Sequence, residues 1–103
     1  MTAEFAVALP AIAVVLATCL AAVVLVAQQV RLTDAAADAA RALGRGESDS
    51  SAVSIAHRVS GVGAGLTSWH EDPFVCVALS APGAGLLSGV TLRAESCALA
   101  GGR

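Results

Sequence analysis

The chain has 103 residues, of which 56% are apolar and 14% are charged, and its formal net charge is −2. This length suits one small domain, or one membrane segment with a small domain attached. The high apolar fraction and the low net charge exclude a disordered chain. Six basic residues against eight acidic ones create no electropositive surface, so we expect no nucleic-acid partner.

The apolar residues gather near the beginning of the chain. Of the 23 residues from 5 to 27, 21 are apolar and none is charged, the exceptions being Pro10 and Thr18. As a helix this run is about 34 Å long, which is enough to cross a bilayer core of about 30 Å. We therefore predict a transmembrane helix. The competing interpretation is a cleaved secretory signal, whose apolar stretch is normally shorter, about 7–15 residues, and follows a basic start.

The helix is predicted to continue beyond the membrane as an amphipathic helix that ends at Gly44 and Gly46. Polar residues recur there at spacings of three and four, and apolar residues line the opposite side. The polar stripe consists of Gln28, Arg31, Asp34, Asp38, Arg41 and Arg45, and the apolar stripe consists of Leu25, Leu32, Ala36, Ala40 and Leu43. We interpret the polar stripe as solvated. The small residues of the apolar stripe suit close packing on another helix or on the domain behind it.

The remaining residues are predicted to form a small head. Residues 47–51 are polar and can cap a second helix that reaches Ser60. Three candidate strands follow at 66–71, 74–80 and 90–99, of which the first is weakly indicated. Two or three strands are not stable alone, so they must pack on the helices. The predicted fold class is α+β, with a long transmembrane and amphipathic helix at 1–45 and an extracytoplasmic head with two or three antiparallel strands at 46–103.

Two cysteines, Cys76 and Cys97, lie in separate candidate strands. If the strands pair, a disulfide would close a loop of about 20 residues and stabilise the head by roughly 3 kcal/mol; two free core thiols are the alternative. A disulfide requires an oxidising compartment and so implies a head outside the membrane. The arginines indicate the opposite orientation. Arg31, Arg41 and Arg45 follow the apolar run and none precedes it, so the positive-inside rule would place the head in the cytoplasm.

No residue pattern indicates an enzyme, a metal site or a cofactor site. His57, His70 and the two cysteines have no zinc-binding spacing, and the glycines at 61–65 form no phosphate loop. There is no catalytic triad and no Cys-x-x-Cys. We therefore predict a structural protein that is not an enzyme and needs no cofactor, in which Trp69 contributes to the head core or contacts a partner.

Glu4 places a carboxylate directly before the apolar run. A charge at this point can interact favourably with the positive end of the helix dipole in the head-group layer. Alternatively, it pairs with a positive amine when several such helices pack side by side, because a charge near hydrocarbon is costly without a partner.

The segment 2–10, Thr-Ala-Glu-Phe-Ala-Val-Ala-Leu-Pro, resembles the start of TadE-like proteins, the minor pilins or pseudopilins of tight-adherence type IV pilus systems. Segments 35–42 and 89–94 are similar to the actinobacterial members. The resemblance implies a structural subunit that inserts by its N-terminal helix and packs laterally with other pilin or pseudopilin subunits and with assembly-platform proteins. Glu4, followed by Phe5 and Pro10 in the same motif, matches the family's glutamate, which is thought to pair with the N-terminal amine of a neighbouring subunit.

The family also implies a basic leader that ends in glycine and is removed by a prepilin peptidase. Because no such leader stands ahead of Met1, we expect the reading frame to begin farther upstream, and a basic leader there would resolve the conflict over orientation. The expected location is the cell membrane, crossed once, with an extracellular head and with a place in a surface pilus. The alternative function is an unprocessed single-pass anchor with a small extracellular domain that binds a partner.

Overall fold

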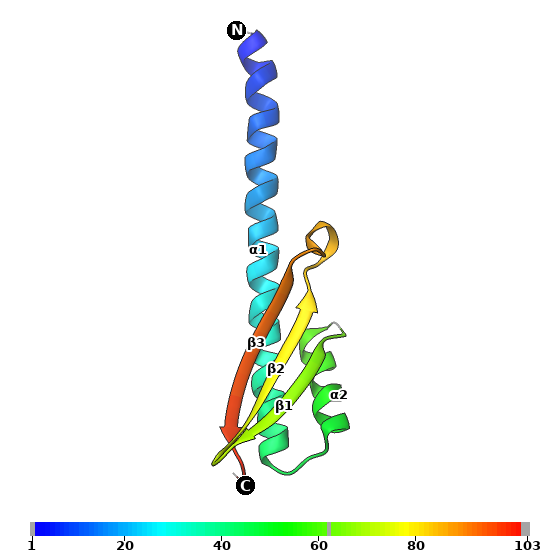
Figure 1. Ribbon diagram of the computed structural model, residues 1–103. Coiled ribbons are helices and arrows are strands. Elements are labelled where there is room, and N and C mark those ends of the chain that lie inside the picture. The colour runs from blue at the N-terminus through cyan, green and yellow to red at the C-terminus, as the bar shows by residue number, and fades with distance from the viewer. Residues whose placement is uncertain (1, 62, 102–103) are drawn as a thin grey trace.

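The computed structural model describes residues 2–61 and 63–101 and consists of one long helix that carries a small head along its C-terminal half (Figure 1). The chain extends over 69 × 20 × 18 Å. The elements in chain order are α1 (Thr2–Gly44), α2 (Asp49–Ser60), β1 (Gly65–Glu71), β2 (Phe74–Pro82), the 3-10 turn η1 (Gly85–Leu87) and β3 (Thr91–Leu99). The predicted α+β fold class is confirmed, and all three candidate strands are present.

The sheet is antiparallel with the strand order β1-β2-β3, and the helices pack against one of its faces (Figure 1). The side chains alternate along the third strand, where Leu92 and Ala94 point inward while Arg93 and Glu95 are exposed. The central strand differs from an alternating pattern, since its residues 75–79 are all buried. This strand has neighbours on both edges, and its outward side chains are small enough to be covered by theirs.

The core is formed mostly by small side chains, and the second half of α1 contributes several of them. Ala35, Ala36, Ala39 and Ala40 have no exposed surface, and they pack in one cluster with α2 and with the inner face of the sheet. Alanine projects only a methyl group, so α2 and the strands can approach the α1 backbone closely. The buried face of α1 is wider than the predicted apolar stripe because it contacts α2 as well as the sheet.

The ends of the helices are closed by local hydrogen bonds and by glycine. The Ser48 side chain caps α2 by accepting a hydrogen bond from the Ser51 N–H at 3.3 Å, as expected for a serine at this position. Gly44 ends α1 where a β-carbon would lie 2.8 Å from the Leu99 carbonyl oxygen. The Gly44 carbonyl accepts a hydrogen bond from the Gly101 N–H at 2.8 Å, so the end of α1 is joined to the end of β3.

Candidate functional site

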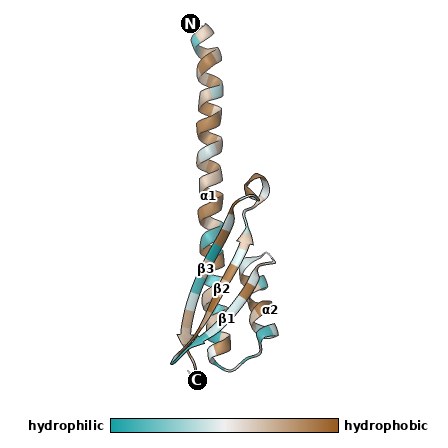
Figure 2. Cartoon of the chain, viewed as in Figure 1, coloured by the Kyte–Doolittle hydropathy of each residue, from teal (hydrophilic) through white to brown (hydrophobic). Residues whose placement is uncertain are grey.

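The first half of α1 is an apolar helix that none of the described residues of the head covers (Figure 2). Residues 2–20 are all exposed. The most apolar 18-residue window of α1 has a mean hydropathy of 2.8 and none of it is buried. A core helix of a soluble protein would have this composition but would be buried. α1 is therefore long and apolar enough to span a membrane, and its large exposed side chains include Phe5, Val7, Leu9, Ile12, Val14, Val15, Leu16 and Leu20.

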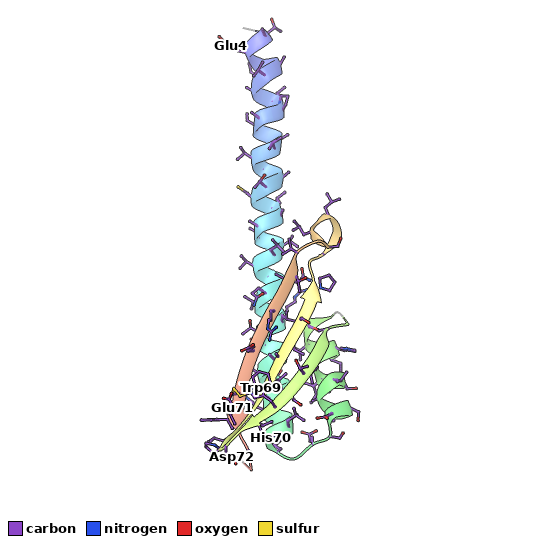
Figure 3. All side chains as sticks on the ribbon, viewed as in Figure 1. Glu4, Trp69, His70, Glu71 and Asp72 are labelled. Atoms are coloured by element: carbon purple, nitrogen blue, oxygen red, sulfur yellow. A yellow bond between two sulfur atoms is a disulfide. The ribbon has the colours of Figure 1, made fainter. Side chains whose placement is uncertain are left out.

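The three residues predicted to act in assembly lie near the free end of this helix. Glu4 is exposed in the first turn of α1 (Figure 3), and no described residue lies within salt-bridge distance of its carboxylate. Phe5 is 69% exposed. α1 continues unbroken through Pro10, which has no N–H to donate to the Ala6 carbonyl. The tip therefore presents a carboxylate, an aromatic ring and an underused carbonyl to its surroundings.

Gln28 is not part of a solvated stripe, and that prediction is wrong for this residue. Its side chain is half-buried and holds the chain between β2 and β3: Nε2 donates to the Pro82 carbonyl at 2.9 Å, and Oε1 accepts from the Ala84 N–H at 3.0 Å. Gln29 adds a hydrogen bond from Nε2 to the Arg93 carbonyl at 2.9 Å. An amide can donate and accept at once, which suits it to bind exposed backbone. In the sequence, the only indication of this attachment is that two glutamines follow the apolar run directly.

The other end of the polar stripe is exposed and paired. Arg41 lies 3.0 Å from Asp38, and Arg45 lies 2.6 Å from Glu47. Exposed pairs of this kind contribute little to stability. For these residues the prediction of a solvated face is confirmed.

The Cys76–Cys97 disulfide predicted as one alternative is present. The two residues are direct partners in the pairing of β2 with β3, and their Cα atoms are 4.0 Å apart. Trp69 is the partner of Cys76 on β1 and is half-buried on the same outer face, and its Nε1 donates to Glu71 Oε1 at 3.2 Å. Cys19, by contrast, is a free thiol on the exposed apolar half of α1.

The hairpin between β1 and β2 forms the end of the head that is farthest from Glu4 (Figure 3). His70, Glu71 and Asp72 are exposed there. Within residues 2–61 and 63–101, no three histidine, cysteine or acidic side chains are grouped so that they could hold a metal ion. The two functional features that the described chain does present are the uncovered half of α1 and the oxidised head.

In comparisons with known proteins, no protein-family model, curated protein or solved structure matches the chain. The features that bear on function are the arrangement of α1 and the head and the sequence resemblance at the tip of α1.

Proposed function

We propose that the chain is a minor pilin-like structural subunit of a tight-adherence type IV pilus assembly or secretion system. The observation that carries the proposal is the division of α1 into an uncovered apolar half and a half that forms the core of the head. A long apolar surface in water is unfavourable, so the first half needs lipid or other helices around it. Both surroundings are apolar, which allows the same surface to move from the membrane into a bundle of like helices.

Glu4 sets the register of that packing. Its carboxylate stands at the start of the apolar run with no partner among the described residues, and a charge near hydrocarbon is stabilised by an opposite charge. The N-terminal amine of a neighbouring subunit supplies that charge when the helices align. Phe5 and the other exposed apolar side chains of α1 supply the contact surface.

The head faces the extracytoplasmic side in this proposal. The Cys76–Cys97 disulfide supports that orientation, because such bonds persist in oxidising compartments. A basic leader ahead of Glu4 would provide the cytoplasmic positive charge that orients the helix, and a prepilin peptidase would remove it.

The proposal is tested by Glu4→Ala in the native host. We expect this variant to reach the membrane in normal amounts but to be at least tenfold depleted from sheared surface fibres or from the purified assembly complex. Thr2→Ala is the matched control, because Thr2 lies two residues before Glu4 on the same exposed tip. This variant should assemble normally. Normal incorporation of the Glu4→Ala chain would remove Glu4 from the mechanism.

The processing step is tested separately by intact mass and N-terminal sequencing of the native membrane protein. An N-terminus left by removal of an upstream leader supports the pilin-like subunit. A terminus at Met1, with the chain absent from any fibre or complex, would instead support the single-pass anchor whose head binds a partner.

A further inference from the structure

We propose that the loop of residues 83–90, which joins β2 to β3, is a second membrane contact that inserts into the lipid interface beside α1. We call it the β2–β3 loop. The inference rests on the proposed crossing of the membrane by α1, and it adds a lipid-binding site within the head. Its ligand is the head-group and upper acyl-chain region of the leaflet that faces the head.

The position of the loop is set by the residue at which the apolar run ends. Gln28 binds the backbone on both sides of Gly83, through the Pro82 carbonyl and the Ala84 N–H. Ala84 also lines a cleft with Val24 and Ala27 of α1. From this attachment the loop projects alongside α1 toward its N-terminal half, as the orange segment in Figure 1 shows. If residues 5–27 lie in the bilayer, the tip of the loop lies at the bilayer surface.

The chemistry of the loop fits a lipid interface better than water. Leu86 is fully exposed at the tip and Val90 is 43% exposed, so the loop presents apolar side chains that the head does not bury. Figure 2 shows hydrophobic residues in this loop by their brown colour. No charged residue occurs between Asp72 and Arg93. Burial of such side chains in the acyl-chain boundary is favourable, whereas a charge there would be costly.

The backbone of the loop is already hydrogen-bonded within itself, which lowers the cost of placing it near hydrocarbon. The Gly83 N–H donates to the Val90 carbonyl at 2.7 Å, and the Leu87 N–H donates to the Ala84 carbonyl at 3.0 Å. Gly83 also packs so closely on the Leu87 backbone that a β-carbon would collide with its carbonyl. The loop is therefore a tight turn that holds Leu86 outward.

Two arginines lie at the base of the loop. Arg31 lines the same cleft as Ala84, and the Arg93 carbonyl is held by Gln29. Both side chains are exposed, and that of Arg93 is paired with Glu95 at 3.1 Å. The long Arg31 side chain at this depth can reach the lipid phosphates while the apolar residues above it enter the membrane. With α1 and the β2–β3 loop both in the lipid, the orientation of the head relative to the membrane is fixed.

The test uses the full chain in phosphatidylcholine vesicles whose acyl chains carry bromine close to the head group. Trp69→Phe removes the only native tryptophan, and Leu86→Trp in that background places a reporter on the exposed tip. We expect bromine to quench this fluorescence at least twofold more than that of Trp69 in the unmodified chain. Leu99→Trp in the same background is the matched control, because Leu99 is 57% exposed but lies at the opposite end of β3.

A reporter on α1 separates the loop from the anchor. Leu16 lies at the middle of the apolar run, so Leu16→Trp in the Trp69→Phe background is measured in matching vesicles whose acyl chains carry bromine near their terminal methyl groups. It should be quenched there if α1 spans the bilayer. Quenching at position 16 without quenching at position 86 would overturn the loop contact and leave the membrane anchor intact. Leu86 would then be assigned to contacts with protein. An absence of quenching at both positions would overturn the anchor and the loop contact together.

A second reporter guards against a misfolded head. Cys19 gives every variant one reactive thiol, whereas Cys76 and Cys97 react only if their disulfide has not formed. A count above one thiol per chain therefore identifies a variant whose head has not folded. Val90→Trp, at the other end of the loop, then replaces such a variant and should also be quenched above the Leu99→Trp control. Equal quenching of the loop and control positions in folded protein would refute the proposal.

Discussion

At the scale of single residues, the Glu47 carboxylate links the two helices of the head. It accepts hydrogen bonds from the Arg45 guanidinium beyond the end of α1 and from the Ser51 hydroxyl in the first turn of α2. The hydrogen bond from Arg45, followed by that from Ser51, lowers the pKa of Glu47 below its ordinary value of 4.5. These bonds favour the ionised form and hold the turn between the helices.

We predict that the contribution of Glu47 to stability is complete above pH 4.5 and is lost as the pH falls through its lower folded-state pKa. The sign follows because a carboxyl whose pKa is depressed by folding binds fewer protons when folded than when unfolded. An NMR titration of the Glu47 side-chain carbon measures the pKa directly. Arg45→Ala should raise the pKa toward 4.5, whereas Arg58→Ala, a change to an exposed arginine on α2, should leave it unchanged. Identical titrations for wild type and Arg45→Ala would contradict the assigned cause.

At the scale of secondary-structure elements, the Cys76–Cys97 disulfide joins two neighbouring strands. It connects β2 to β3 across a separation of 21 residues, and this stretch includes the β2–β3 loop. A cross-link of this span restricts the unfolded chain and stabilises the folded state by about 2–4 kcal/mol. A three-stranded sheet packed on mainly alanine side chains has little other apolar surface to bury, so the covalent bond makes a large contribution.

We predict that Cys76→Ala/Cys97→Ala lowers the free energy of unfolding of the head by about 2–4 kcal/mol. The measurement is urea unfolding in detergent micelles, followed by the fluorescence of Trp69 on β1. Cys19→Ala is the matched control because this free thiol lies on the uncovered half of α1, and it should leave the head unchanged. Equal unfolding midpoints for the two variants would show that the disulfide does not stabilise the head.

At the scale of the whole molecule, the two halves of α1 lie in different surroundings. Its first half has an exposed apolar surface all round, and its second half buries one face between α2 and the sheet. Large apolar residues suit the first situation, where nothing in the head limits their size. Alanines suit the second, because the neighbouring elements lie close to the helix backbone.

We predict opposite responses to the same substitution in the two halves. Ala39→Leu adds a bulky side chain where no surface is exposed, so overpacking should destabilise the head by about 1–3 kcal/mol. Ala22→Leu, on the exposed half, should leave the head as stable as wild type. Urea unfolding in micelles compares the two, and a tolerated Ala39→Leu would mean that the alanine core can move apart.

The sequence by itself determined the elements and their boundaries to within a few residues. The apolar run, the three-and-four spacing up to Gly44, Ser48 as a cap and the alternation in β3 are local patterns, and each follows from the geometry of one helix or strand. The resemblance at Glu4, Phe5 and Pro10 is also a property of consecutive residues. Such signals survive in a single sequence because they do not depend on how distant segments meet.

Only the tertiary structure decided which distant segments touch. It selected the bridged state of Cys76 and Cys97 from two alternatives, because disulfide formation requires β2 and β3 to pair in one register. It showed that Gln28 is hydrogen-bonded to the chain between β2 and β3, and that Ala84 of the β2–β3 loop lies beside Val24 and Ala27 of α1. The Gln28 hydrogen bonds join residues more than 50 positions apart and the disulfide joins residues 21 positions apart, and local periodicity carries no information about such pairings.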